Sequence, residues 1–222
     1  TDTAIASGAG RSAPWTDEIQ FETLTAGTFD IGLSSLTFYE TAFFHKPSRT
    51  LIVTDCLARV PRSLPSQSLS DPQNLLLISK RSTADAFPSD TVEARQVGWE
   101  KTALLVSYFF PEHEELDPDA GLGVVTWTDG WHDNFNALSG RLLVPPVVRT
   151  LIYAQDPPQV KRWVQRVAAR WDFEQIVPAH WEAPIRASPT DFVNAFAFLD
   201  DETIDPFPAN DLARGLKLIA DV

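Results

Sequence analysis

Hydrophobic residues recur along the chain with two different spacings, one typical of strands and one typical of helices. Residues 18–24 alternate apolar and polar side chains, residues 36–45 are rich in aromatics, and residues 50–56 are β-branched. We predict strands there, because β-branched and aromatic residues suit a pleated surface. The link 46–49 contains a proline, which predicts a hairpin turn whose second strand runs into Asp55.

The clearest helical period lies in residues 156–171. Its apolar residues recur with spacings that place them on one face of a helix. They are Val160, Trp163, Val164, Val167, Ala168 and Trp171. Asp156 is the expected N-cap. Apolar strands are predicted on either side, at 147–154 and 174–180, so the three elements predict a βαβ unit with a parallel strand pair.

The remaining segments predict shorter helices, loops and a tail. A helix over 188–201 opens on Ser188 and Asp191, a variant of the capping box. Further helices are predicted over 72–80, 98–110 and 210–222. An acidic loop is predicted over 111–123, and a loop or hairpin over 127–140, which is rich in turn formers. Small polar residues over 1–17 predict an extended tail, which leaves 18–222 as a single α/β domain.

Charge and composition narrow the class of partner. The net charge of −12 argues against nucleic acid, whose phosphates require a basic surface, and leaves a basic protein partner open. Cys56 is the only cysteine, so no intramolecular disulfide can form, as is usual in a reducing compartment. The longest apolar stretch, 102–110, is far shorter than the roughly 20 residues of a transmembrane helix.

Two residues carry candidate chemistry. Asp55 follows one apolar strand and His180 follows another. Sheets of α/β proteins place their active sites at the C-terminal ends of strands, and a carboxylate with an imidazole suits zinc, iron or manganese. The alternative is that Asp55 caps a turn and His180 makes a local hydrogen bond. Both interpretations stay open at this point.

Other candidate residues favour structural roles. His45 precedes a turn, His113 lies in the acidic segment, and His132 lies in the segment predicted as a loop. Cys56 follows Asp55 and is expected to be a buried, inert thiol. The sequence contains no H-x-H-x-D-H, H-E-x-x-H or C-x-x-C motif, no nucleophile elbow and no phosphate-binding glycine loop.

Several stretches resemble a known family. They are "AFFHKPSRTLIVTDCLARVP", "GWEKTALLV", "LLVPPVVRTLIYAQDPPQVKRWVQRVAARWDFEQIVPAHWEAPI" and "FVNAFAFLDD…FPANDLARGL". The chain is similar across 18–222 to uncharacterised plastid proteins of plants and algae that carry a domain-of-unknown-function label. That family is distantly similar to the metallo-β-lactamase-fold hydrolases. The resemblance implies a plastid (chloroplast) location and a partial or degenerate αββα sandwich that corresponds to the family's C-terminal part.

The resemblance also implies a ligand set. "LIVTD" resembles the fourth metal motif of the metallo-β-lactamase superfamily and "VPAH" the fifth, so Asp55 would be a bridging carboxylate and His180 a histidine of the second metal. The superfamily's main H-x-H-x-D-H motif has no counterpart here, and residues 18–44 contain no histidine. A mononuclear catalytic zinc needs three protein ligands. We therefore expect Asp55 and His180 to be vestigial ligands, with no catalytic residues and no cofactor, and zinc or iron as the metal if one binds.

The expected function is that of a non-catalytic accessory or linker subunit of a larger plastid assembly, with a photosystem–light-harvesting supercomplex as the candidate. Its partners would be proteins of a membrane-bound complex, and the chain itself would be soluble or peripheral to the thylakoid membrane, with no transmembrane segment. Two alternatives stay open. One is a metal-dependent hydrolase of an ester or phosphoester that uses Asp55 and His180 with His45 or His132. The other is an assembly factor that binds its client transiently.

Overall fold

The structure is a computed structural model that describes residues 15–31, 34–66, 71–82, 84–108, 113–116, 125–127, 130–201 and 207. The chain divides into two compact units. The first unit comprises Thr1–Ala58, Leu142–Val144 and Ile152–Ile204, and the second comprises Arg59–Arg141, Pro145–Leu151 and Asp205–Val222. The predicted helix over 210–222 and most of the predicted tail lie outside the described residues. The prediction of one domain over 18–222 stays a prediction.

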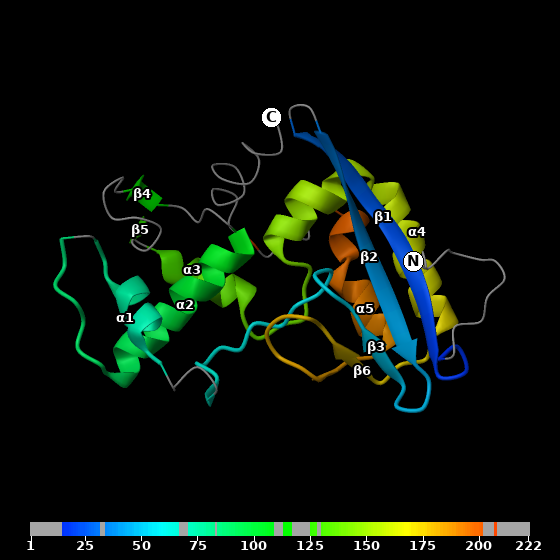
Figure 1. Ribbon diagram of the computed structural model, residues 1–222, viewed down its shortest axis with the longest axis horizontal. Helices are drawn as coiled ribbons and strands as arrows, with labels where there is room; N and C mark the ends of the chain where they lie inside the picture. Colours follow the sequence, from blue (N-terminus) through cyan, green and yellow to red (C-terminus); the bar gives the residue numbers. More distant parts are fainter. Residues whose placement is uncertain are drawn as a thin grey trace. The chain divides into compact units, whose positions relative to one another are not determined.

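The first unit is built on a five-stranded sheet in the order β1-β2-β3-β6-β7 (Figure 1). Its strands are β1 Ile19–Ile31, β2 Ser34–His45, β3 Thr50–Ile52, β6 Gln175–Val177 and β7 Ile185–Arg186. β3 and β6 run parallel, whereas the other neighbours are antiparallel. The sheet is therefore mixed, and the predicted α/β class is confirmed.

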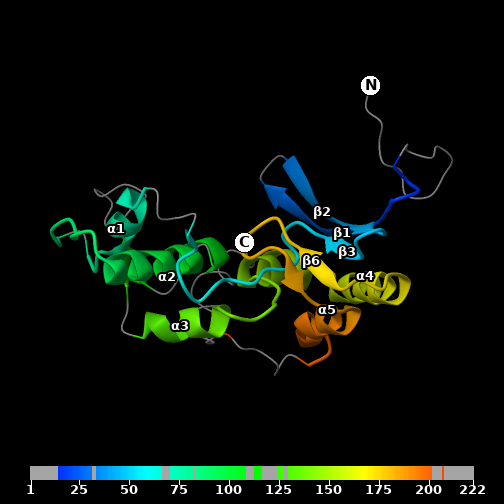
Figure 2. The ribbon, with the colours of Figure 1, turned by 90° about the horizontal axis from the view of Figure 1, so that it is seen from below.

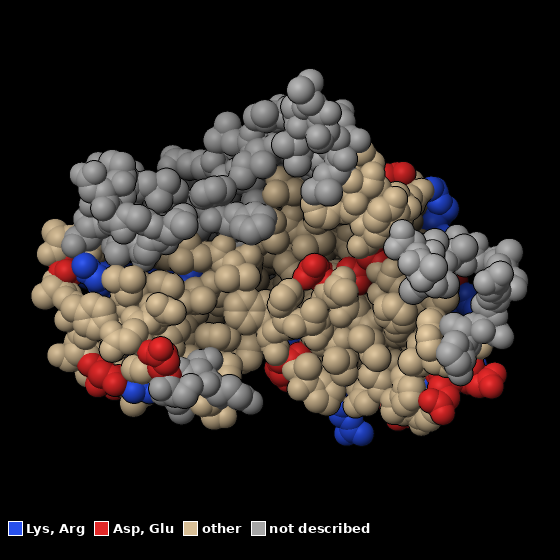
Figure 3. Space-filling view, viewed as in Figure 1, with Lys and Arg blue, Asp and Glu red and all other residues tan. Residues whose placement is uncertain are grey.

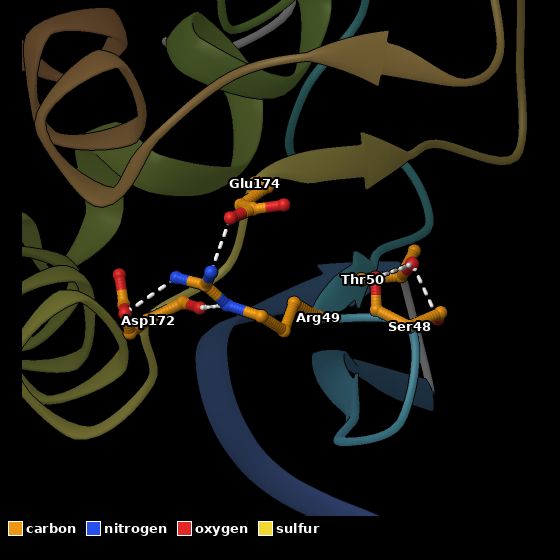
Figure 4. Close-up of polar contacts among 5 residues, drawn as sticks. All are labelled: Ser48, Arg49, Thr50, Asp172 and Glu174. Atoms are coloured by element: carbon orange, nitrogen blue, oxygen red, sulfur yellow. Dashed lines mark hydrogen bonds and ion pairs between the residues drawn. The ribbon is translucent and has the colours of Figure 1, made fainter.

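The turn between β2 and β3 ties the hairpin to the start of β6. Arg49 has a φ of +49°, which is uncommon for a residue other than glycine. Its guanidinium donates to the Asp172 carbonyl at 2.9 Å and to the Asp172 carboxylate at 2.5 Å, and it also pairs with Glu174 (Figure 4). The Glu174 amide in turn donates to the Arg49 carbonyl at 2.9 Å. This set of bonds places β6 alongside β3.

Two helices cover one face of the sheet: α4 Pro157–Arg170 and α5 Pro189–Ala195 (Figure 2). The predicted caps are confirmed, since Asp156 accepts a hydrogen bond from the Gln159 amide and Ser188 forms a capping box with Asp191. A 3-10 turn, Ala197–Leu199, follows α5. The apolar stripe of α4 faces the sheet, and its buried members are Val160, Trp163, Val164 and Val167.

The predicted strand over 147–154 is wrong. That segment forms a π-helical turn, Val148–Ile152, followed by a 3-10 turn, Tyr153–Gln155. The Arg149 amide donates to the Pro145 carbonyl at 2.9 Å, so the preceding proline begins a helical turn rather than an extended chain. A short apolar run suits a buried helical turn as well as a strand, and periodicity cannot separate them. β6 therefore takes β3 as its parallel partner, and the predicted βαβ unit is wrong.

The second unit contains three helices and a small hairpin among its described residues. They are α1 Gln73–Ser79, α2 Val92–Tyr108, α3 Trp131–Leu138, β4 His113–Leu116 and β5 Val125–Trp127. α1 and α2 confirm the predicted helices, although α2 begins earlier than expected. The two helices cross closely at Gly98, where a Cβ would lie 2.0 Å from the Leu75 carbonyl oxygen.

Two predicted loops in this unit are wrong. The segment 127–140 contains α3, which begins after Gly130 at a φ of +92° and includes turn formers such as Asn134 and Asn136. Asn, Asp and Gly favour helix starts as well as turns, so composition concealed the helix. The acidic segment 111–123 contains β4, which pairs antiparallel with β5. That pairing depends on a partner strand rather than on the local sequence.

None of the helices in the described part of the chain is long and apolar enough to cross a membrane.

Candidate functional site at the ends of β3 and β6

The structure brings the two predicted site residues together. β3 and β6 lie side by side in parallel, with Leu51 opposite Ile176 and Ile52 opposite Val177. The pairing continues past the strand ends, where the Val53 amide donates to the Val177 carbonyl at 3.0 Å. The loops that follow carry Asp55 and His180.

Asp55 and His180 contact each other directly. His180 Nε2 lies 3.0 Å from Asp55 Oδ1, and the two side chains remain 63% and 59% exposed respectively. Among the described residues, no group of three or more His, Cys, Asp or Glu side chains is arranged to hold a metal ion. The pair thus supplies two potential metal ligands, both exposed to solvent. Its role as a metal site stays a prediction.

Glu40 holds the loop that carries Asp55. Its carboxylate accepts hydrogen bonds from the Thr54 amide at 2.9 Å, the Thr54 hydroxyl at 2.6 Å and the Asp55 amide at 3.2 Å. Burial raises the pKa of Glu40, and the nearby Asp55 charge adds to that effect, while the hydrogen bonds from Thr54 and Asp55 oppose it. Glu40, a buried residue of β2, therefore holds the loop that carries Asp55.

Sequence reasoning missed Glu40. It lies in β2 on the same face as Ala42 and Phe44, both of which are buried. The sequence did contain a signal. Glu40 is an acidic residue in a strand whose other core-facing residues are apolar. Buried carboxylates are rare unless they are hydrogen-bonded, so such a residue predicts a specific set of donors near it.

Two further buried groups lie near Glu40 and Asp55. Cys56 and Tyr153 are almost fully buried, and burial raises the pKa of both the thiol and the phenol. The negative charges of Glu40 and Asp55 raise both pKa values further. A thiol with a raised pKa holds little thiolate at neutral pH and is a poor nucleophile. The predicted burial of Cys56 is confirmed.

The other histidines lie elsewhere. His45 pairs with Thr50 at the start of β3, the end opposite to Asp55, and its Nδ1 lies 2.6 Å from the Ser48 hydroxyl in the turn. His132 belongs to the second unit, where its Nδ1 lies 3.0 Å from Glu100 Oε2 and its ring stacks on Trp131. His113 begins β4, also in the second unit.

The sheet face opposite α4 and α5 is built mainly of uncharged residues. Strand register places Phe21, Phe43, Ile52 and Val177 in one row across β1, β2, β3 and β6. Phe21 also contacts the Trp15 ring, at 6.2 Å between centroids. We call this surface the open face and define it by Phe21, Thr23, Thr25, Tyr39, Thr41, Phe43, Ile52 and Val177.

Every member of the open face is half-buried or exposed, and none is charged. Tyr39 is 65% exposed and Ile52 is 37% exposed. Figure 3 looks onto this side, where tan atoms predominate and some red atoms of Asp or Glu are also visible. Arg186 of β7, which pairs with Gln175, brings a charge only at the margin. Contiguous apolar surface of this kind marks sites of interaction.

Comparison of the sequence with models of protein families identified one family. Residues 1–198 match the family model described as "Domain of unknown function (DUF4336)", and the match includes the segment predicted as a tail. Comparisons with curated proteins and with solved structures found no match.

Proposed function

We propose that this chain, which belongs to the DUF4336 family, is a non-catalytic accessory or linker subunit that docks onto a larger plastid assembly. The open face is the observation that carries the proposal. It presents a row of apolar side chains across four strands, with exposed Tyr39 and Ile52, and no charge among its members. A soluble sheet that is covered on one side normally alternates apolar and polar residues. The apolar residues of the open face therefore suit a partner.

The occupant that we propose is an uncharged surface of a protein subunit. Tyr39, Phe21 and Phe43 provide the aromatic area that dominates binding energy at protein interfaces. The threonines between them can satisfy hydrogen bonds at the same surface. None of the residues that define the open face carries a charge, so a partner that contacts them would not bury a charged group of this chain.

The architecture supports a degenerate metallo-β-lactamase-like fold as the origin of this surface. An αββα sandwich packs two sheets face to face between two helical layers. The described part of the first unit has one sheet with α4 and α5 on one side, which corresponds to half of such a sandwich (Figure 2). In the complete fold the open face would be the buried middle of the sandwich. Such an origin would explain why the open face is apolar.

The geometry of Asp55 and His180 supports a vestigial site. The imidazole nitrogen that would bind a metal lies against the Asp55 carboxylate, and each group serves as the other's partner. Glu40, the nearest buried carboxylate, is already engaged with Thr54 and Asp55. The pair acts here as a tie between the two loops.

The resemblance to plastid proteins supports the location. We place the chain in the chloroplast, soluble or peripheral to the thylakoid membrane, with a photosystem–light-harvesting supercomplex as the candidate assembly.

The test is native-gel migration of the full chain with gently solubilised plastid membranes. Wild type should migrate with a large complex, and the double variant Tyr39→Ser/Ile52→Ser should migrate alone. The matched control is Val92→Ser/Val193→Ser, which removes exposed apolar area outside the open face and should still comigrate. Wild-type migration alone, near 24.7 kDa, would contradict the proposal.

A metal-dependent hydrolase of an ester or phosphoester is the second candidate. The direct approach of Asp55 and His180 at adjacent strand ends favours it. Stoichiometric zinc or iron in the purified protein, lost together with esterase activity in Asp55→Ala, would establish this candidate and set the accessory role aside.

A transient assembly factor is the third candidate function. Rapid loss of the comigrating band on dilution, with full recovery on remixing, would distinguish a transient client from a permanent partner.

A further inference from the structure

The exposed side of α4 is basic in an acidic protein. All four charged residues of the helix are cations: Lys161, Arg162, Arg166 and Arg170. The whole chain has 18 basic and 30 acidic residues, so this helix departs from the general balance. The three arginines repeat every fourth position and lie on one side of the helix over about 12 Å. We call Arg162, Arg166 and Arg170 the arginine row.

Acidic neighbours compensate only part of this charge. Glu22 of β1 lies 3.6 Å from Arg166 and 2.5 Å from Arg170, so one carboxylate serves two guanidinium groups. Lys161 pairs with Asp200. Within the described part of the chain, Arg162 has no ion-pair partner, and Arg166 and Arg170 remain 51% and 49% exposed. The helix face therefore keeps an excess of positive charge that is open to solvent.

The arginine row and the open face belong to opposite sides of the first unit. Val160, Trp163, Val164 and Val167 turn one side of α4 toward the sheet, and the arginine row lies on the remaining circumference. Figure 2 shows α4 on the side of the sheet away from the open face. One unit therefore carries an uncharged docking surface and a cationic one that do not overlap.

We infer that the arginine row binds a carboxylate-rich segment of a second protein, so that the first unit bridges two partners. This inference rests on the proposed docking role and adds the second contact that a linker needs. Guanidinium groups bind carboxylates through paired hydrogen bonds, and their four-residue spacing matches glutamates on every turn of a partner helix. Nucleic acid and anionic membranes need a basic surface broader than one helix face, and this chain has a net charge of −12, whereas a short acidic segment needs only the local excess of cations on α4.

The experiment uses the full chain and a capped alanine-based helical peptide with glutamate at every fourth residue. Binding is measured by chemical-shift titration at 20 mM and 200 mM salt, because contacts between exposed charges weaken as salt screens them. The double variant Arg162→Gln/Arg166→Gln should raise the Kd about fivefold, the sum expected for two exposed ion pairs. A peptide with glutamine in place of glutamate should show no binding.

The matched control is Arg81→Gln/Arg141→Gln, which removes the same charge from exposed arginines of the second unit. It should leave the Kd unchanged. Equal weakening by both double variants would mean that net charge alone drives binding, and the inference would be wrong. Binding of phosphatidylglycerol vesicles by the arginine row, with no binding of the glutamate peptide, would also overturn it in favour of a membrane contact.

Failure of this inference is separable from failure of the docking role. The variant Tyr39→Ser/Ile52→Ser should bind the glutamate peptide as wild type does and lose comigration with the plastid complex. If the arginine row binds no peptide while wild type still comigrates, the docking role is supported and the proposed contact of the arginine row with an acidic segment is wrong. If wild type does not comigrate at all, the docking role itself falls.

Discussion

The two faces of the five-stranded sheet differ in which of the described elements cover them. On the side of α4 and α5, Leu51 and Ile176 are fully buried. On the open face the neighbouring Ile52 is 37% exposed and Tyr39 is 65% exposed. Both faces carry apolar residues along the same strands, although among the described residues helices pack against only one of them (Figure 2).

This difference separates stability from interaction. The covered face lowers the free energy of the folded chain, because its apolar area is removed from water on folding. The open face adds little to that free energy while its side chains stay in contact with solvent. The proposed partner surface would explain its apolar residues. Substitutions on the covered side should therefore change stability, and those on the open face should change assembly.

The largest effect is expected for Trp163→Ala. The Trp163 side chain is fully buried, and its ring packs edge-on against Phe192 at 5.9 Å between centroids. Its indole N–H also donates to the Glu22 carbonyl at 3.3 Å. We expect a loss of about 3–5 kcal/mol in the free energy of unfolding, measured by urea denaturation at 25 °C. Tyr39→Ala is the comparison on the open face, where a change within about 0.5 kcal/mol is expected. Equal losses would remove the distinction between the faces.

A smaller and sharper contrast comes from adjacent residues of β3. Leu51 and Ile52 point to opposite faces, and only Leu51 is fully buried. Leu51→Ala should cost about 2–5 kcal/mol because it opens a cavity, whereas Ile52→Ala should cost about 1 kcal/mol or less. Thermal unfolding of both variants checks this. Only Ile52→Ala should weaken comigration with the plastid complex, and a stable variant that still comigrates normally would count against the open face as the docking site.

The buried carboxylate of Glu40 should make the free energy of unfolding depend on pH. Burial raises the pKa of Glu40 above its ordinary value of 4.5, so the folded chain holds this proton at a pH where the unfolded chain has released it. The contribution of Glu40 to stability is therefore largest below pH 4.5 and falls as the pH rises through the raised pKa. Relative to Glu40→Gln, the wild type should lose unfolding free energy over that window. A difference that is constant with pH would contradict this assignment.

The smallest effect is expected at the exposed pair. Asp55 and His180 are in contact, yet both side chains are more than half exposed. Exposed polar contacts of this kind contribute about 0–1 kcal/mol at most, so Asp55→Asn should change the free energy of unfolding by no more than that. The same variant should leave comigration intact if the pair is vestigial. Loss of a bound metal in this variant would instead support the hydrolase.

The sequence predicted the parts of the fold that depend on local pattern and capping. The helix α4 and its Asp156 cap follow from the apolar period, and the capping box of Ser188 and Asp191 marks the start of α5. Of the site, the sequence predicted Asp55 and His180 because each follows an apolar strand. It missed Glu40, since nothing local reveals which loop a buried carboxylate will hold.

The failures share a physical cause. Residues 147–154 are apolar enough for a strand and form helical turns instead, and turn formers near Gly130 conceal α3. In both segments the choice depends on neighbours distant in the chain, because burial rewards any conformation that hides the same apolar side chains. Local propensity cannot decide between such conformations.

The sequence by itself determined the alternation of apolar residues in the strands, the amphipathic period and basic charge of α4, and the positions of Asp55 and His180 at strand ends. The tertiary structure alone decided that β3 pairs with β6, which brings those two residues within 3.0 Å, and that helices cover one face of the sheet. Strand pairing joins residues more than a hundred positions apart, and the sequence pattern of either strand fits several partners. Only the packed chain selects one of them, because hydrogen bonds and burial must be satisfied together.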